Sequence, residues 1–350
     1  MLSNDECVIV GPFDEVPIDT AESRFDAIES KVESFASQVV EYPPLQCCHA
    51  VMQTLQRGAR QRRGALAARG VKRIDEAQPV GPARGMLVTG LTGTGKTKIA
   101  THYLERYPRY DSEDRTVIPV LFFELPSEPR SNVVAERLLF ALGDPYPKEG
   151  SGALRMERAK KLIRACQTDL IIIGEVQHAT DNLDSRARDI TGDALKDLMN
   201  LGVPTVFFGL PSARSYFVKN QQLGRRCTPK IALRPFSVAK EAERNDFLGV
   251  LMSLDRLLPM VGPSALMDPG CASALHFASF GLFGQLSQLI AEALRIALTM
   301  EDNALRREHL KLAFEQSIFP DCGDVRNPFS TKFNGMPLTR PEEPYNGLVD

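Results

Sequence analysis

The sequence lacks the features of membrane-spanning and secreted proteins. No apolar run reaches the roughly 18 residues that a transmembrane helix requires. The richest stretch, Leu286 to Met300, is interrupted by Gln288, Glu292 and Arg295. The N-terminus (MLSNDECVIV) has neither a basic start nor a long apolar stretch, which argues against a secretion signal. We therefore expect a cytoplasmic protein without a membrane partner.

Cysteine usage and charge exclude further classes. The seven cysteines are an odd number without a Cys-x-x-Cys pair, and Cys47 and Cys48 are adjacent. This arrangement supports neither a disulfide framework nor a zinc site and fits a reducing compartment. A net charge of −2 excludes a wholesale polycation, although a local nucleic-acid surface remains compatible with it. Hydrophobic residues at 43% exclude wholesale disorder.

The charge changes sign within residues 1–79. The first 35 residues contain nine acidic side chains against two basic ones, whereas residues 57–73 contain seven basic side chains and no acidic one. Apolar residues before the basic stretch predict a helix that runs into it. We interpret 1–79 as an acidic and then basic helical segment, which ends at the proline- and glycine-rich connector 79–85.

Residues 80–235 alternate between two patterns. Apolar runs of strand length are separated by stretches of helical periodicity, namely 96–107, 132–142, 154–166 and 187–201; the apolar runs are 86–89, 117–125, 170–173, 203–208 and 231–233. Strands that are apolar on both faces and alternate with helices predict a parallel sheet covered on each side. We therefore expect an α/β domain over 80–235.

The strand pattern stops after Pro235. Helical patterns follow at 238–254, 272–280, 285–300 and 305–317, so we expect a helical domain over 236–318. Five prolines then interrupt the polar stretch 319–350. This composition predicts an extended tail, and Phe329, Phe333 and Tyr345 are possible partner anchors within it.

A phosphate-binding loop is the strongest motif. The segment fits the pattern G-x-x-x-x-G-K-[ST], with a strand before it and a helix after it; its residues are Gly90, Leu91, Thr92, Gly93, Thr94, Gly95, Lys96 and Thr97. The glycines let successive backbone N–H groups face an anion at a helix N-terminus. Lys96 would neutralise phosphate oxygens and the Thr97 hydroxyl would ligate Mg²⁺, which predicts ATP and Mg²⁺ as cofactors.

A second acidic motif departs from the usual pattern. The apolar strand LIII is followed by Gly174 and Glu175 where nucleotide hydrolases carry Asp-Glu. Glu175 is placed to orient or deprotonate the attacking water. The carboxylate that holds the metal's water shell is missing at Gly174, and loss of such a group costs roughly 10–100-fold in metal affinity or activity. We expect nucleotide binding with slow or impaired hydrolysis.

Beyond these motifs, the chain resembles an AAA+ ATPase and, more narrowly, the TniB/TnsC family of bacterial transposition regulators. The resemblance rests on ordered segments from about 20 to 318: GLTGTGKT, FFELPSEP, LIIIGEVQHA, DALKDLMNLGVPTVFFGLPSAR, QLGRRCTPKIALRPF and GLFGQLSQLIAEALRIAL. It implies an α/β fold, with an AAA+ P-loop parallel-sheet domain, a small helical lid domain and an extended C-terminal tail.

The resemblance also implies roles for individual residues. Arg226, with Arg225 beside it, matches the arginine finger that acts on a neighbouring subunit's nucleotide. The sensor residue that usually ends the fourth strand is replaced by Gly209, with Ser212 nearby. Gln285 and Gln288 lie where the lid would carry a sensor arginine. These departures again favour binding over turnover.

The family forms oligomers on DNA, so the resemblance implies a self-assembling ring or helix on double-stranded DNA. Backbone phosphates require basic and small polar side chains. The expected contacts are Arg130, Ser131 and Asn132 after the SEP segment, and Arg155, Arg158, Lys160 and Lys161 on the next helix. The basic run 57–73 is the alternative surface, and a plain solvated helix face is equally compatible with it.

Four functions remain open from the sequence. The leading one is an ATP-dependent regulator that assembles on target DNA and recruits transposase and a TniQ/TnsD-type target selector in the bacterial cytoplasm. The second is a replication initiator or helicase loader, which would require a winged-helix domain after the lid. The third is a small-molecule P-loop kinase, and the helical domain and Arg225-Arg226 argue against it. The fourth is a nucleotide-binding scaffold that does not hydrolyse, which Gly174 favours.

Overall fold

The computed structural model describes residues 18–68, 83–179 and 185–348, which divide between two compact units. The sheet unit comprises Val39–Ser253 and Ser279–Leu286. The helical unit comprises the residues up to Gln38, Leu254–Ala278 and the residues from Ser287 onward. The first long helix along the chain therefore groups with the C-terminal helices and not with the basic helix that follows it in the sequence.

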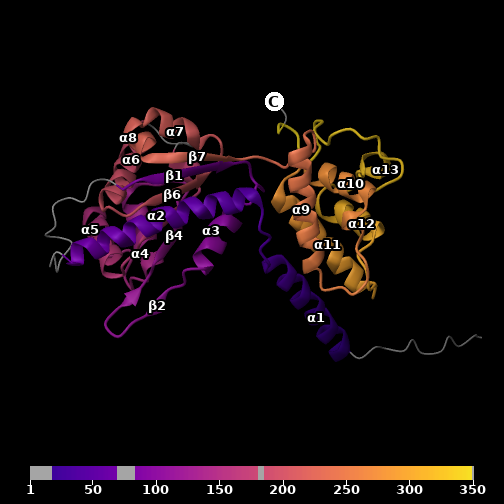
Figure 1. The fold of residues 1–350 in the computed structure, drawn as a ribbon, viewed down its shortest axis with the longest axis horizontal. Helices are drawn as coiled ribbons and strands as arrows, with labels where there is room; N and C mark the ends of the chain where they lie inside the picture. Colours follow the sequence, from indigo (N-terminus) through magenta and orange to yellow (C-terminus); the bar gives the residue numbers. More distant parts are fainter. Residues whose placement is uncertain (1–17, 69–82, 180–184, 349–350) are drawn as a thin grey trace, which may run out of the picture. The chain divides into compact units, whose positions relative to one another are not determined.

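A five-stranded parallel sheet forms the centre of the sheet unit (Figure 1). Its spatial order is β4-β5-β6-β1-β7, with the bounds β1 Gly85–Gly90, β4 Val120–Glu124, β5 Leu170–Gly174, β6 Thr205–Gly209 and β7 Cys227–Leu233. The first strand in sequence therefore lies inside the sheet, between β6 and β7. Ligands of open parallel sheets bind beyond the carboxyl ends of strands where the strand order reverses, and β1 ends at such a point.

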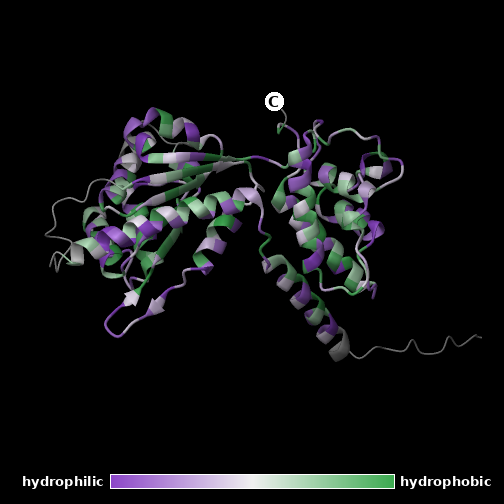
Figure 2. Cartoon of the chain, viewed as in Figure 1, coloured by the Kyte–Doolittle hydropathy of each residue, from purple (hydrophilic) through white to green (hydrophobic). Residues whose placement is uncertain are grey.

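Helices cover both faces of this sheet. The helices α2 (Pro43–Ala68) and α3 (Lys96–Glu105) pack on each other and on β1. The opposite face packs against α4 (Ser131–Leu142), α5 (Gly152–Ala165) and α6 (Ser185–Asn200) in one hydrophobic core. Figure 2 shows the central strands as mainly hydrophobic, because strands buried on both faces carry apolar side chains at successive positions.

Several short elements of the sheet unit were not predicted. The hairpin of β2 (Tyr110–Asp111) and β3 (Thr116–Val117) precedes β4, and η1 (Val176–Ala179) follows β5. The helices α7 (Ala213–Lys219) and α8 (Gln221–Arg226) separate β6 from β7. These elements are too short for hydrophobic periodicity to reveal them.

The helical unit is built from long amphipathic helices. It contains α1, η2, α12, α13 and parts of α9, α10 and α11. Their bounds are α1 Ile18–Ser37, α9 Glu241–Leu257, η2 Ala265–Met267, α10 Pro269–Ser279, α11 Phe283–Thr299, α12 Arg307–Ser317 and α13 Gly323–Arg326. The acidic character of α1 has a structural partner, since Glu29 pairs with Arg295 of α11 at 2.7 Å. No helix in the described ranges is long and apolar enough to cross a membrane.

The expected extended tail is packed into the helical unit. It contains little regular structure beyond α13, but Phe329 and Tyr345 are each only 3% exposed. These two are core residues and not the partner anchors that the sequence suggested, whereas Phe333 is partly buried against Phe277. Arg326 forms a two-pronged ion pair with Glu343 at 2.6 and 2.7 Å. Sequence analysis detects packed segments by their hydrophobic periodicity. This irregular segment has none, because isolated aromatic residues and one ion pair hold it in place.

Candidate nucleotide-binding site

The phosphate-binding loop connects the end of β1 to the start of α3, as the motif predicts. Gly93 and Gly95 have φ angles of +82° and +87°, in the left-handed region that glycine adopts without steric cost. Gly95 is also the residue that precedes the first turn of α3. The loop therefore places backbone N–H groups and a helix N-terminus together, which is a ready arrangement for an anion.

Lys96 lies inside this loop. Its Nζ donates to the backbone oxygens of Gly90 and Leu91, each at 2.8 Å. Burial lowers the pKa of Lys96, and the nearby Glu175 carboxylate partly opposes that effect. An ammonium group held by two loop carbonyls can neutralise phosphate charge without leaving the loop, so the predicted role of Lys96 fits its position.

Glu175 is held by a residue that the sequence did not single out. Glu175 follows β5 with a φ of +53°, and its carboxylate accepts a hydrogen bond from the side-chain amide of Gln177. The amide oxygen of Gln177 accepts from the backbone N–H of Leu210 at 3.0 Å, and Gln177 is 3% exposed. Gln177 thus connects Glu175 to the residue that follows β6.

The side chains of η1 also explain why Gly209, at the end of β6, carries no side chain. A methyl group at Gly209 would lie 2.7 Å from Val176 Cγ1 and 3.0 Å from Gln177 Oε1. The side chains of η1 therefore fill the space at the end of β6 where the family usually carries a polar residue. Only the tertiary structure brings Gln177 there, since its position in the sequence beside Glu175 does not indicate a contact with β6.

The loop also contacts the start of α11. The backbone N–H of Gly284 donates to the carbonyl of Gly93 at 2.7 Å, and both residues belong to the sheet unit. Tyr42 stacks on Phe283 with ring centroids 5.0 Å apart. Its hydroxyl is buried beside Gly95 and has no hydrogen-bond partner among the described residues. A buried unpaired hydroxyl is unusual in a folded protein.

Arg225 and Arg226 end the short helix α8. Arg225 is exposed, whereas Arg226 is partly buried and donates to Asn200 Oδ1 at 2.9 Å. Gly224 permits this arrangement, because a methyl group there would lie 2.1 Å from the carbonyl oxygen of Phe217 on α7. The arginine-finger role of the pair stays a prediction from the sequence resemblance.

The two groups of expected DNA contacts differ in their internal pairing. Arg130 precedes α4 with a side chain that is 72% exposed, and its ion pair with Glu128 is long, at 3.4 Å. Asn132 is exposed and Ser131 partly exposed. These three residues are accessible to phosphates.

The basic residues of α5 are mostly engaged within the protein. Arg158 pairs with Asp144 at 2.9 Å and donates to backbone carbonyls of the preceding loop. Lys160 pairs with Glu157 at 2.9 Å and with Asp197 at 3.3 Å. Lys161 remains exposed. The geometry therefore favours the group that begins at Arg130 over the α5 group.

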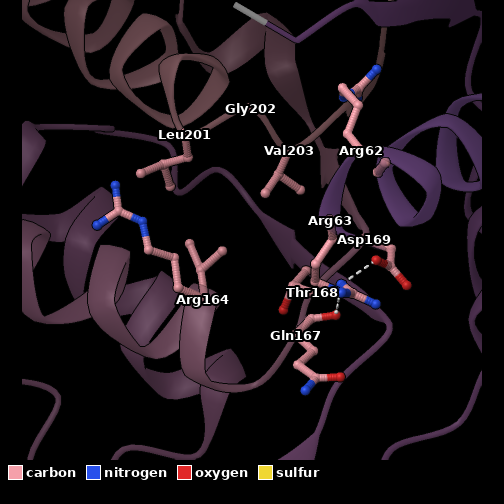
Figure 3. A pocket seen from close by; sticks show the side chains of 11 residues that line it. Arg62, Arg63, Arg164, Gln167, Thr168, Asp169, Leu201, Gly202 and Val203 are labelled. Atoms are coloured by element: carbon pink, nitrogen blue, oxygen red, sulfur yellow. Dashed lines mark hydrogen bonds and ion pairs between the residues drawn. The ribbon is translucent and has the colours of Figure 1, made fainter. Parts of the chain in front are cut away.

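Some basic side chains of the alternative surface on α2 are also engaged in ion pairs within the protein. Arg60 and Arg63 both pair with Asp169, whose side chain is 3% exposed. Arg63 and Asp169 line a pocket of about 60 Å³. Figure 3 shows Arg63 facing Asp169, with Arg62 and Arg164 on opposite sides of the pocket. A buried carboxylate requires such partners. These two arginines therefore stabilise the fold. Of the remaining run, Arg57 and Arg62 are exposed, and residues 69–73 lie outside the described residues.

The residues at the loop fit a nucleotide-bound Mg²⁺ and not a metal held by protein alone. No group of three or more histidine, cysteine or acidic residues in the described part could hold an ion. Mg²⁺ keeps several waters and takes one or two protein oxygens together with phosphate oxygens. The exposed Thr97 hydroxyl in the first turn of α3 and the Glu175 carboxylate near Lys96 are oxygen donors of that type.

Comparison with known proteins agrees with this geometry. Two solved structures from Aeropyrum pernix share the fold. The ORC1 protein in complex with DNA is 18% identical with a TM-score of 0.50, and the match covers 74% of this chain and 64% of that chain. The ORC2 protein in its ADP form is 12% identical with a TM-score of 0.50, and the match covers 75% of this chain and 67% of that chain. The chain thus spans about two thirds of their length. No curated protein matches the sequence.

The family comparison covers the segment that carries the site. Residues 70–237 match the family described as bacterial TniB protein. This segment contains the phosphate-binding loop, Glu175 and Arg226. The likeness to these two structures shows that the α/β fold around the site is shared. Over residues 70–237 the chain is therefore similar to the TniB family, in agreement with the resemblance of the ordered sequence segments.

Proposed function

We propose that this protein is an ATP-dependent regulator of DNA transposition that assembles on double-stranded DNA in the bacterial cytoplasm. The observation that carries the proposal is the Gly90–Thr97 loop, where two left-handed glycines, Lys96 and the α3 N-terminus converge near Glu175. The match of residues 70–237 to the family described as bacterial TniB protein supports the role in transposition. The partners proposed on that basis are transposase and a TniQ/TnsD-type target selector.

In this proposal, ATP binding and assembly are one linked equilibrium. Lys96 binds the triphosphate in one subunit, and Arg226 of the adjacent subunit approaches the same phosphates, supported by Arg225. A Mg²⁺ ion held by Thr97 and the phosphates would supply charge neutralisation. Accessible residues at the start of α4 contact the DNA backbone, and phosphate contacts add up along the assembly.

The experiment combines duplex DNA with ATP, a non-hydrolysable analogue or ADP and images the protein by electron microscopy. Rings or filaments that need both ATP and DNA support the proposal, and a monomer that ignores both contradicts it. Lys96→Ala should abolish nucleotide binding and assembly. Arg226→Ala should weaken assembly while the monomer still takes up nucleotide. Arg214→Ala, which removes an exposed arginine of α7, is the matched control.

Mixing the two defective variants tests the contact between subunits. In a mixture, a Lys96→Ala subunit can still supply Arg226, and an Arg226→Ala subunit can still bind nucleotide through Lys96. One complete contact between the two variants is therefore possible, and the mixture should recover part of the assembly that neither variant shows alone. Absence of any recovery would contradict an arginine that acts on a neighbour. A second candidate function, a scaffold that binds ATP without hydrolysis, is favoured by Gly174 and is separated by measuring ATP turnover in the assembled state.

A further inference from the structure

A carboxylate from the neighbouring strand occupies the space beside Gly174. Gly174 ends β5 and is in register with Glu124, which ends β4. A methyl group at Gly174 would lie 2.9 Å from Cγ of Glu124 and 3.6 Å from its Oε1. At the position where nucleotide hydrolases carry an aspartate, this chain has glycine, and the Glu124 side chain lies in the space that the aspartate side chain would enter.

The chain lengths of the two side chains explain how this exchange is possible. Directly paired residues of parallel strands present their side chains on the same face, and the strands lie about 4.8 Å apart. Glutamate has one methylene more than aspartate, so Glu124 can extend over a neighbour that lacks a side chain. A residue with a Cβ at position 174 would have to displace the Glu124 side chain from that path.

The Glu124 carboxylate is also free to act on a cation. The residue is exposed, and no basic side chain in the described part of the chain forms an ion pair with it. An exposed carboxylate needs no partner within the protein, so Glu124 remains available to solvent and to a cation. Its place beside Gly174 follows from the register in which β4 and β5 pair.

We propose that Glu124 supplies the metal-directed carboxylate that Gly174 lacks. The inference rests on the proposed nucleotide binding at Gly90–Thr97 and adds a positioning residue to that site. Glu124 would hold the water ligands of a nucleotide-bound Mg²⁺, and Glu175 would remain the group that orients the attacking water. The departure at Gly174 is then a relocation of the carboxylate by one strand and not its loss.

The relocation couples the two positions. Because Cγ of Glu124 lies 2.9 Å from the methyl position at Gly174, Gly174→Asp alone introduces a clash together with a second negative charge. It should therefore not improve metal binding. The double variant Gly174→Asp/Glu124→Ala removes the clash and returns the carboxylate to β5, so it should recover most of what Glu124→Ala loses.

The test measures metal affinity and not turnover. Mn²⁺, which is paramagnetic, replaces Mg²⁺, and its dissociation constant is measured by electron paramagnetic resonance with a non-hydrolysable ATP analogue bound. Binding of a fluorescent ATP analogue without metal is measured in parallel. Glu124→Gln should leave metal-free nucleotide binding unchanged and weaken Mn²⁺ binding by roughly 10–100-fold. Glu128→Gln, at an exposed acid of the same loop, should change neither.

Each outcome bears on a different claim. Unchanged Mn²⁺ affinity in Glu124→Gln, or a double variant no better than Glu124→Ala, would overturn the role of Glu124 while the nucleotide site stands. Improved Mn²⁺ affinity in Gly174→Asp alone would overturn the coupling of the two positions and, with it, the proposal. Failure of the unsubstituted protein to bind the analogue, or equal binding by Lys96→Ala, would overturn the nucleotide site itself.

Discussion

Gln177 donates its side-chain amide to the carboxylate of Glu175 and, through its amide oxygen, accepts a hydrogen bond from the Leu210 N–H at 3.0 Å. This buried side chain therefore links the end of β5 to the residue after β6. A carboxylate that must orient water depends on such outer contacts for its direction. In this protein the link passes over Gly209, where a side chain from the strand itself would collide with Gln177.

Replacing Gln177 with leucine should slow ATP turnover. The substitution keeps the volume but leaves the Glu175 carboxylate and the Leu210 N–H without their partner. We expect a loss of about 10–100-fold in kcat, with nucleotide affinity unchanged because the phosphate-binding loop is untouched. Steady-state turnover in the presence of DNA checks this. Gln222→Leu, at an exposed position of α8, is the control, and equal turnover of both variants would refute the assignment.

A methyl group at Gly284 should disturb the phosphate-binding loop. It would lie 3.1 Å from both the Cα and the oxygen of Gly93, and overpacking against backbone costs about 1–3 kcal/mol. We expect Gly284→Ala to lower the melting temperature and to weaken nucleotide binding. The matched control is Gly249→Ala in α9, where no atom lies within 4 Å of the added methyl. That control should be neutral or stabilising by about 0.5–1 kcal/mol.

Arg130 and Arg158 should differ in their effect on DNA binding. Each phosphate contact contributes about 0.9 to the slope of log affinity against log salt concentration. Arg130→Ala should reduce that slope and weaken binding at all DNA sequences. Arg158→Ala should instead lower the melting temperature, since Arg158 holds Asp144 and the adjacent loop, and should keep the slope. Fluorescence anisotropy over a salt series distinguishes the two, and the reverse pattern would identify α5 as the DNA surface.

The Arg326–Glu343 pair should make the helical unit sensitive to acid. Burial raises the pKa of Glu343, but hydrogen bonds from Arg326 and the Arg340 backbone outweigh it, so the pKa lies below the ordinary value of 4.5. As the pH falls below 4.5, the unfolded chain takes up the proton before the folded one, and the contribution of the pair to stability is lost.

The test compares unsubstituted protein with Glu343→Gln. At neutral pH the variant should melt at a lower temperature, because it leaves the Arg326 guanidinium in the packed tail without its counter-charge. The difference in melting temperature should shrink as the pH falls below 4.5. A difference that stays constant with pH would show that the charge of Glu343 does not stabilise the unit.

Local patterns in the sequence were sufficient for the sheet and the phosphate-binding loop. The buried strands were visible as apolar runs because both of their faces are covered. The loop was visible because an anion cradle at a helix N-terminus requires glycine and lysine at set spacing. The similarity to the TniB family over residues 70–237 was visible in the order of several such segments.

The tertiary structure decided which side chains lie beside Gly174 and Gly209. Glu124 meets Gly174 because two strands pair in register, and Gln177 reaches the end of β6 because η1 folds over Gly209. It also decided that Arg60, Arg63 and the aromatic residues of the tail serve the fold. The physical reason is that motifs record chemistry carried by neighbours in the chain, whereas a contact between strands or loops depends on register and packing, which no local pattern encodes.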